Sequence, residues 1–372
     1  MKRVKVFYII SDIDKALAFE WVNDGLDKHK IELHFLLLGK TETPFIEFLR
    51  SRNTPHHVVP YRGKADLLRA WWSVFKILRN HKPDVVHTHL WIANLLGLSA
   101  SWLAGIRKRI YTRHHATLHY REYPSGLKWD KLNNRLATDI VAISKSIEEI
   151  LVDWDGANPA KVTRIHHGFD LHYFEAIAPE TVDRLRDKYK LAGQHPVVGV
   201  IARYTPWKGI QFIIPAFKKI REKYDKGHLV LANAQGEYEG AIREMLRTLP
   251  EGSYTEIKFE ANIAALYRLF DVFVHVPTDA HAEAFGQTYV EALAAGVPSV
   301  FTLSGVAREY IQHRENAMVV DFENSLQIEE AIVEILESLV LREQLTASGS
   351  DVVKSFGLGL FMERLENLYL SK

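Results

Sequence analysis

The sequence predicts an α/β protein made of two doubly wound parallel sheets that follow each other along the chain. Short β-branched runs alternate with stretches of helical periodicity in the first half, and the same alternation returns in the second half. A polar stretch at about 171–194 separates the halves, and 372 residues suit two domains of ordinary size better than one. We therefore expect an N-terminal domain over 1–175, a C-terminal domain over 176–355 and a final helix over 356–372.

The first half shows the strand and helix pattern of consecutive βαβ units. Strands are expected at 4–12, 31–39, 56–61, 84–90, 108–115 and 139–144. Helices are expected at 15–29, 43–52, 64–83 and 93–105.

The second half repeats this pattern after the polar stretch. Strands are expected at 196–203, 227–234, 256–260, 271–277 and 298–302, and helices at 210–224, 238–249, 262–270 and 287–296. Ligands of open α/β sheets bind beyond the carboxyl ends of the strands, so the loops that follow the strands are where a functional site is expected.

Composition excludes several classes of protein. The longest apolar runs are far shorter than the roughly 20 residues of a membrane span. The N-terminal "MKRVKVFYIISD" has too short an apolar run for a signal peptide and is interpreted as a first strand. The absence of cysteine removes disulfides, thiolate nucleophiles and thiolate metal ligands, which fits a reducing compartment. The expected location is the cytoplasm, including the inner face of the membrane.

The two halves differ in charge, although the net charge of the chain is only +1. Residues 1–175 hold 26 lysines and arginines against 19 aspartates and glutamates, and 176–372 hold 21 against 27. Thirteen of the 18 histidines also lie in the first half. Either the first domain faces an anionic ligand or membrane, or the opposite charges hold the two domains together.

Two cations follow the first strand of the second half in the segment "RYTPWKG". Arg203 and Lys208 precede Gly209 and a helical stretch, so they could offset the charge of a diphosphate while helix N–H groups approach it. An Arg/Lys pair in a loop is also common as plain solvated surface.

The segment "HAEAFGQTYVEALAAGVP" places Glu283 in a loop and Glu291 inside the helix that follows it. Eight residues of helix rise roughly 12 Å, so the two carboxylates cannot act together on one bond. Between them, Phe285, Gly286 and Gln287 would present the unpaired N–H groups of the helix start. A nucleotide diphosphate sugar fits this layout, because an anion docked at the helix start would have a carboxylate for sugar hydroxyls on each side. The alternative is that both glutamates are ordinary surface charges.

These motifs together resemble the retaining glycosyltransferases of the GT-B fold, in particular glycosyltransferase family four. Glu283 and Glu291 are similar to its E-x7-E motif, and "RYTPWKG" is similar to its R-x-x-x-x-K-G. The resemblance extends through "SGVAREYIQHRENAMVVD" and "IHHGFDLHYF", so it covers most of the second half. It implies two Rossmann-like domains that face a cleft, with the last helix crossing back to the N-terminal domain.

The resemblance also implies a role for each matched residue. Arg203 and Lys208 match the pair that holds the donor diphosphate, and Glu291 matches the glutamate that binds the ribose. Glu283 matches the glutamate at the transferred sugar, and "FEANIAALY" resembles the stretch whose backbone accepts the base. The implied catalytic set is His114, Glu283, Arg203 and Lys208. The implied donor-binding set is Arg203, Lys208, Phe285, Gly286, Gln287 and Glu291.

The first half matches the family less closely. "RIYTRHHATLH" is similar to a strand-end segment of the family and places His114 at its active-site histidine, with His115 beside it. Many members carry a glycine-rich loop after the first strand, but the loop here, from Ser11 to Ala16, has none. Asp12 and Asp14 there would repel an anion unless they are paired with a cation such as Lys15, so we assign this loop no role.

Other readings are weaker. The histidines of "HTH", "RHH" and "IHH" lack the spacing of a zinc site, so no metal is expected. No sustained basic face predicts nucleic-acid binding, and no G-x-G-x-x-G predicts an NAD enzyme. Aromatic residues and cations around "AWWSVFKILRNHK" suit contact with an anionic membrane, although burial in the core explains the aromatic residues equally well.

We therefore expect a retaining hexosyltransferase that moves a sugar from a nucleotide diphosphate donor, UDP-sugars being favoured, to a glycan or lipid-linked acceptor in polysaccharide biosynthesis. The resemblance implies no cofactor and no essential metal, and a leaving phosphate that helps to deprotonate the acceptor. The alternatives are a related nucleotide-sugar epimerase or phosphorylase, and a non-catalytic glycan-binding protein.

Overall fold

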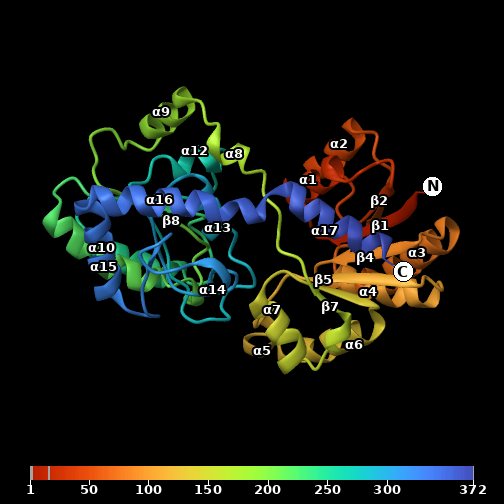
Figure 1. Cartoon of the computed structure of the whole chain (residues 1–372). Coiled ribbons are helices and arrows are strands. Elements are labelled where there is room, and N and C mark those ends of the chain that lie inside the picture. Colours follow the sequence, from red (N-terminus) through yellow and green to blue (C-terminus); the bar gives the residue numbers. More distant parts are fainter. Residues whose placement is uncertain (1–2, 16, 372) are drawn as a thin grey trace. The chain divides into compact units, whose positions relative to one another are not determined.

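The computed structural model describes residues 3–15 and 17–371, and it separates into two compact units. Unit 1 consists of 1–169 together with 356–372, and unit 2 is 170–355 (Figure 1). The chain therefore passes from unit 1 to unit 2 after Phe169 and returns before Phe356. The sequence had placed the first boundary six residues later, at 175. Among the described residues, no helix is both long and apolar enough to cross a membrane.

Unit 1 is built on a seven-stranded sheet in the order β3-β2-β1-β4-β5-β6-β7, and every neighbouring pair is parallel. Its strands are β1 (Val4–Ser11), β2 (Ile31–Gly39), β3 (His56–Pro60), β4 (Val85–His89), β5 (Lys108–Arg113), β6 (Asp139–Ala142) and β7 (Val162–Arg164). The first six confirm the strands expected in the first half, whereas β7 was not foreseen.

The helices of unit 1 cover both faces of this sheet. They are α1 (Leu17–Gly25), α2 (Pro44–Ser51), α3 (Leu67–His81), α4 (Trp91–Leu103), α5 (Leu118–Arg121), α6 (Leu127–Leu136), α7 (Lys145–Glu149) and α17 (Leu358–Leu370). Residues of α1, α2 and α17 share one apolar core with the sheet, and residues of α3 and α4 share the other. This is the doubly wound arrangement that the alternating pattern predicts.

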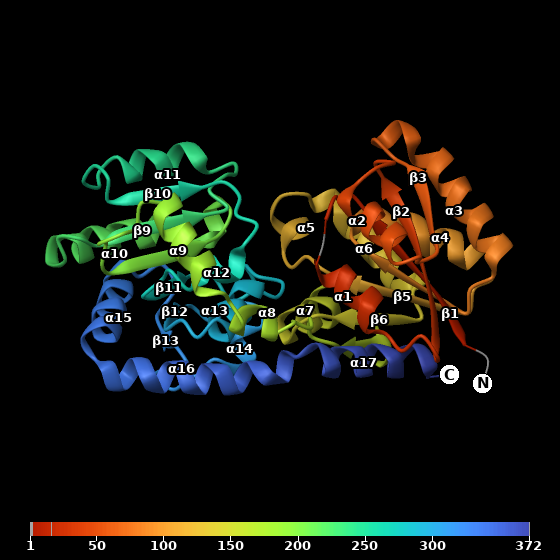
Figure 2. The same cartoon turned by 90° about the horizontal axis from the view of Figure 1, so that it is seen from above.

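The last helix, α17, packs on α1 and β1 of unit 1, as Figure 2 shows. Met362, Leu365, Leu368 and Tyr369 are its buried residues. The Tyr369 hydroxyl lies 2.6 Å from the Tyr8 hydroxyl and 2.7 Å from Nδ1 of His87. These hydrogen bonds and the apolar contacts make the C-terminal helix an integral part of the first unit, which confirms the expected return of the chain.

Unit 2 is built on a six-stranded parallel sheet in the order β10-β9-β8-β11-β12-β13. Its strands are β8 (Val197–Ile201), β9 (His228–Ala232), β10 (Tyr254–Ile257), β11 (Val272–His275), β12 (Ser299–Phe301) and β13 (Met318–Val319). Its helices are α8 (His172–Glu175), α9 (Pro179–Lys188), α10 (Ile210–Lys223), α11 (Glu239–Leu246), α12 (Ile263–Tyr267), α13 (Gln287–Ala294), α14 (Ala307–Tyr310), α15 (Ser325–Glu337) and α16 (Leu339–Val353). The central strands are fully buried, as expected where helices cover both faces.

Replacing Tyr369 by phenylalanine should destabilise unit 1 by about 1–3 kcal/mol, because the buried Tyr8 hydroxyl and His87 ring would lose a hydrogen-bond partner. Melting followed by circular dichroism measures the change. Tyr123→Phe is the matched control, because the Tyr123 side chain is 59% exposed. Equal melting temperatures for Tyr369→Phe and the control would contradict the role given to this hydroxyl.

Candidate active site

Three loops at the carboxyl ends of the unit 2 strands carry most of the predicted site. In the strand order, the chain continues in opposite directions from the neighbouring strands β8 and β11. Ligands of open α/β sheets bind beyond the carboxyl ends of the strands at such a switch point. Arg203 follows β8, Glu283 follows β11 and Ser304 follows β12, so the loops that hold them start at the same edge.

Glu283 is the centre of a buried charged cluster. Its Oε1 atom forms an ion pair with the Lys208 ammonium and lies 3.0 Å from Nε2 of His275. Its backbone N–H donates to Oγ of Ser304 at 3.0 Å. Burial raises the pKa of Glu283, but Lys208 and the hydrogen bond from His275 outweigh burial and bring this pKa down to about 2. Glu283 is therefore ionised at neutral pH.

His275, the last residue of β11, forms a hydrogen bond with the Glu283 carboxylate. Burial lowers the pKa of His275, so the ring is neutral and Nε2 donates the hydrogen bond to Glu283. The His275 ring packs edge-on against the Tyr289 ring at 4.8 Å between centroids. The Tyr289 hydroxyl in turn donates to the carbonyl of Thr302 at 3.0 Å. These contacts fix the position of the carboxylate.

Two glycines allow the loops to approach each other closely. Gly209 has φ of 74°, and a Cβ atom there would lie 1.9 Å from the carbonyl oxygen of Val276. Gly305 has φ of 56°, and a Cβ atom there would lie 2.6 Å from the carbonyl oxygen of Phe285. That carbonyl also accepts a hydrogen bond from Val306 N–H at 2.9 Å. The loops after β8, β11 and β12 therefore form one packed structure.

The start of α13 offers backbone donors beside this cluster. Gly286 is its N-cap with φ of 85°, and no side chain caps the helix. The N–H groups of a first helical turn have no partner within the helix and favour an anion. Gln287, the first helical residue, is exposed, whereas Phe285 is buried. The structure thus places the predicted helix start where the sequence put it, between Glu283 and Glu291.

Glu291 lies within α13 in a different environment from Glu283. Its Oε2 atom accepts a hydrogen bond from the Tyr267 hydroxyl of α12 at 2.9 Å. Burial raises the pKa of Glu291 to about 7, although the hydrogen bond from Tyr267 acts to lower it. No cation is among the causes of this shift. Glu291 is therefore partly protonated at neutral pH. It accepts hydrogen bonds in its ionised form and can also donate one in its protonated form.

Arg203 and Lys208 differ in their surroundings. The Arg203 side chain is exposed, and among the described residues nothing pairs with its guanidinium. Lys208 is part-buried and paired with Glu283. Of the residues predicted for unit 2, the structure brings Lys208 and Glu283 into contact, leaves Arg203 at the same sheet edge, and gives Glu291 a separate partner.

Sequence reasoning missed three residues of this site. His275 and Tyr267 hold the two glutamates, and Ser304 anchors the backbone of Glu283. His275 ends the strand that precedes Glu283, which is a signal that the sequence does contain. Tyr267 and Ser304 are near the glutamates only through the tertiary structure, so no local pattern indicates them.

His114, the predicted histidine of unit 1, lies in a cluster of imidazoles at the end of β5. Its Nε2 atom is 3.1 Å from Nδ1 of His89, and its ring stacks on that of His167 at 5.5 Å. Burial, followed by the charges of neighbouring histidines, holds the pKa of His114 well below its usual value. His114 is therefore neutral, so it can form hydrogen bonds but does not serve as a cation.

His115 points into a different cluster. Its Nε2 atom lies 3.4 Å from Oδ2 of Asp130, which also contacts His119 at 2.6 Å. The fully buried Arg113 lies 3.0 Å from the same oxygen and 3.3 Å from Asp155. Burial lowers the pKa of His115 to about 4. The two carboxylates pair with the buried Arg113 guanidinium, and Asp130 also gives His115 a structural partner.

The glycine-free loop after β1 is held by a cation other than the one suggested by the sequence. Lys40, rather than Lys15, pairs with Asp14, at 2.7 Å. Asp12 has φ of 54°, and burial raises its pKa. Ala16, at the end of this loop, lies outside the described residues.

Comparison with known proteins matches two family models to separate parts of the chain. The model of the glycosyl transferases group 1 matches 181–351, and the model of glycosyltransferase family 4 matches 23–173. The chain is 27% identical to the capsular polysaccharide biosynthesis glycosyltransferase CapM of Staphylococcus aureus, over 99% of this chain and 97% of that protein.

One further relative and one solved structure are informative. A GDP-mannose-dependent alpha-(1-6)-phosphatidylinositol monomannoside mannosyltransferase of Mycobacterium tuberculosis is 30% identical over 46% of this chain and 45% of its own. The crystal structure of HepE from Anabaena in complex with UDP-glucose has a TM-score of 0.84, with 20% identity and 98% of both chains covered.

The two Rossmann-like units, with the last helix returned to the first unit, form the GT-B fold. The two family models together span most of the chain and describe the same kind of enzyme. The chain belongs to the group 1, family 4 glycosyltransferases.

Proposed function

We propose that this glycosyltransferase moves a hexose from a nucleotide diphosphate sugar, with UDP-sugars favoured, to a glycan or lipid-linked acceptor, with retention at the anomeric carbon. The observation that carries the proposal is the pair of glutamates on either side of an uncapped helix start. Glu283 is held ionised by Lys208 and His275, and Glu291 is held near its pKa by burial and Tyr267. One extended donor with two hydroxyl-rich ends and a central anion suits both glutamates.

The diphosphate would bind at the start of α13. The uncapped N–H groups after Gly286 carry the positive end of the helix dipole. Arg203 adds an exposed guanidinium at the same edge of the sheet, and Lys208 adds an ammonium. As the sugar leaves, charge develops on the diphosphate, and these groups stabilise it.

Lys208 has a second role in the proposed cycle. In the structure, its ammonium is paired with Glu283. A diphosphate competes for this ammonium, and its binding frees part of the Glu283 carboxylate for the hydroxyls of the transferred sugar. The hydrogen bond from His275 holds that carboxylate in place meanwhile. The ion pair therefore keeps both groups oriented until the donor arrives.

Glu291 would bind the ribose. A carboxylate accepts hydrogen bonds from two neighbouring hydroxyls, and Tyr267 fixes the orientation of this one. Because burial destabilises the charge of Glu291, two hydroxyl donors from the ligand stabilise it. Donor binding should therefore favour the ionised form.

In the proposed reaction, the bond from the anomeric carbon to the diphosphate oxygen breaks, and a bond to the acceptor oxygen forms on the same face of the sugar. The proton of the acceptor hydroxyl passes to the leaving phosphate. No protein nucleophile and no essential metal takes part. Neutral His114 would donate or accept a hydrogen bond at the sugar or the acceptor.

The relatives support the donor and acceptor classes. HepE forms a complex with UDP-glucose, the mycobacterial enzyme depends on GDP-mannose, and both of these ligands are nucleoside diphosphate sugars. The name of CapM places it in capsular polysaccharide biosynthesis, and that of the mycobacterial enzyme specifies a phosphatidylinositol mannoside. A glycan or lipid-linked acceptor is the common class.

Helix α3 supports contact with an anionic membrane at the cytoplasmic face. Leu68 is 82% exposed and Trp72 is 50% exposed. The Lys76 ammonium lies 5.4 Å from the centre of the Trp72 ring. Trp71 and Phe75 instead pack against the apolar core, so the aromatic stretch is divided between burial and exposure. Exposed cations at Arg62, Lys64 and Arg69 precede or accompany these residues.

The proposed function predicts that a UDP-sugar raises the melting temperature more than GDP- or ADP-sugars do, because a ligand of the folded state stabilises it. The transferred sugar should keep the anomeric configuration of the donor, as read by nuclear magnetic resonance of the product.

Lys208→Ala and Glu283→Gln should lower kcat/KM by about 10²–10³-fold, because each removes stabilisation from the transition state. Circular dichroism reports whether the variants remain folded.

Lys218→Ala is the matched control, because Lys218 is an exposed lysine of α10. An inverted product would refute retention, and unchanged turnover in both site variants would refute the site. A rearranged donor in place of a transferred sugar would point to an epimerase. Binding of a donor without turnover would point to a non-catalytic protein.

Glu291 should make the stability of unit 2 depend on pH. Its pKa is raised to about 7 in the folded protein from about 4.3 in the unfolded chain, so its ionisation costs stability as the pH rises between these values. The cost is absent below pH 4 and reaches about 3–4 kcal/mol well above pH 7. The melting temperature of Glu291→Gln relative to the natural protein should therefore rise from pH 5 to pH 8. Parallel melting profiles would contradict the raised pKa.

The membrane contact predicts that the protein floats with vesicles that contain phosphatidylglycerol, and that 1 M salt weakens this binding because exposed charges are then screened. Replacing Leu68 and Trp72 together by serine should abolish flotation. Trp102→Ser is the matched control, because Trp102 is a 59% exposed tryptophan on α4. Equal flotation with neutral phosphatidylcholine vesicles, or of the α3 double variant, would refute the contact.

A further inference from the structure

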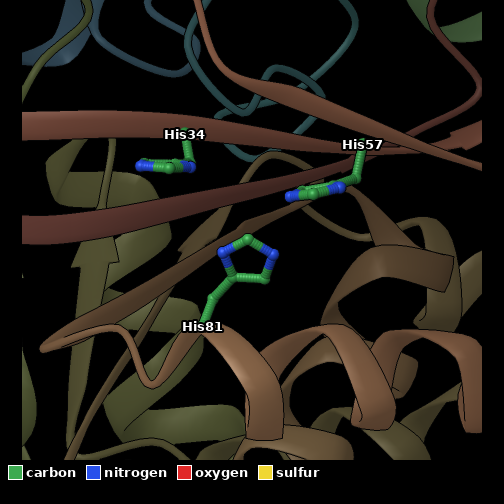
Figure 3. A group of neighbouring side chains, drawn as sticks. All are labelled: His34, His57 and His81. Atoms are coloured by element: carbon green, nitrogen blue, oxygen red, sulfur yellow. The ribbon is translucent and has the colours of Figure 1, made fainter.

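Three histidines from separate elements of unit 1 meet at the edge of its sheet. His34 lies on β2, His57 on β3 and His81 at the end of α3. One ring nitrogen of each lies within 4.8 Å of one from each of the others. Figure 3 shows His81 pointing from its helix into the space between His34 and His57. None of these histidines belongs to the candidate active site.

The sheet register explains why the side chains converge. His57 pairs with Leu36 and Phe7 pairs with His34, so His34, His57 and Phe7 lie on the same face of the sheet. The Phe7 ring stacks on the His34 ring at 4.8 Å and fixes its plane. Helix α3 covers this face, and its last residue brings His81 to within 4.6 Å of the His57 ring centre.

His34 is oriented as a ligand of a metal ion would be. It is 8% exposed, and its Nε2 lies 2.8 Å from Oε1 of Glu32. A carboxylate can only accept, so Nε2 carries the proton and Nδ1 has a lone pair. Nδ1 is buried and has no hydrogen-bond partner among the described residues. A carboxylate that accepts from the second nitrogen of a histidine is the usual outer partner of a histidine that binds a metal.

We propose that His34, His57 and His81 bind a zinc ion, with water in the fourth position. Imidazole nitrogens suit this ion, and three protein ligands leave one position open. Tetrahedral bonds of about 2.0–2.1 Å place ligand nitrogens roughly 3.3 Å apart. The ring nitrogens lie within 4.8 Å of one another in the structure, so zinc binding requires the partly exposed His57 and His81 rings to rotate toward His34.

The surroundings agree with this assignment. The His57 and His81 rings are only part-buried, so a metal ion can reach both. Neither ring has a hydrogen-bond partner among the described residues. Arg3 and Lys5 lie 3.8 and 3.9 Å from the Glu32 carboxylate, which offsets their charge.

A second group of possible ligands, His115, His119 and Asp130, fits a metal less well. The Asp130 oxygen in that group already contacts the buried Arg113 guanidinium at 3.0 Å. A fixed cation at this distance repels a metal ion and occupies the oxygen that would bind it.

The zinc ion would stabilise the edge of the sheet. β3 is the edge strand, and a metal held by β2, β3 and α3 would cross-link three elements that are far apart in the sequence. Metal that binds only the folded chain adds its binding free energy to the stability. The motifs from which the sequence predicted no metal include none of these three histidines.

Equilibrium dialysis of the full-length protein against Zn²⁺, with the metal counted by mass spectrometry, tests the proposal. We expect one equivalent per chain and an increase in melting temperature that a chelator reverses. His57→Gln and His81→Gln should each weaken binding by at least about 10-fold and remove the increase. Their melting temperatures without metal should stay close to that of the natural protein, because neither ring has a hydrogen bond to lose.

His56→Gln is the matched control, because His56 is the next residue of the same strand and its Nδ1 lies 2.9 Å from the carbonyl of Thr54. It should keep the zinc and the increase in melting temperature. Absence of stoichiometric binding would overturn the proposal. Binding that survives both His57→Gln and His81→Gln, or that is lost in His119→Gln instead, would overturn it as well.

Discussion

The Glu283 carboxylate, buried between one cation and one neutral imidazole, is the interaction on which the candidate site depends. Burial of an unpaired carboxylate is costly, and Lys208 and His275 offset that cost. Each partner comes from a different part of the sheet edge: Lys208 from the loop after β8, and His275 from the end of β11. Satisfying this one charge therefore requires the loops to pack together, and Gly305 allows the loop after β12 to join them.

The two glutamates of the site illustrate how environment divides one residue type between two states. Glu283 has an ammonium beside it, and its pKa falls to about 2. Glu291 has only a tyrosine hydroxyl, and burial raises its pKa to about 7. Three buried histidines of unit 1 follow the same rule, because burial without a carboxylate keeps His87, His89 and His114 neutral.

The fold was largely predictable from the sequence, because hydrophobic periodicity is a local property. Strands and helices alternate in both halves as the pattern indicates, and Gly286 marks the helix start between the two glutamates. The first boundary falls at 169 rather than at the expected 175. The short strand β7 was missed, because a strand of three residues has too few positions to show a period. The pairing of Asp14 with Lys40 could not be read from the sequence, because Lys40 is distant along the chain and Lys15 is adjacent.

The sequence by itself determined which side chains are available for chemistry and at which strand ends they lie. It therefore indicated Arg203, Lys208, Glu283 and Glu291 as the candidate donor-binding residues. Only the tertiary structure decided which of them touch, because contacts across a parallel sheet depend on strand order and register rather than on spacing along the chain. The pairing of Lys208 with Glu283, the support of Glu291 by Tyr267, and the meeting of His34, His57 and His81 all arise in this way.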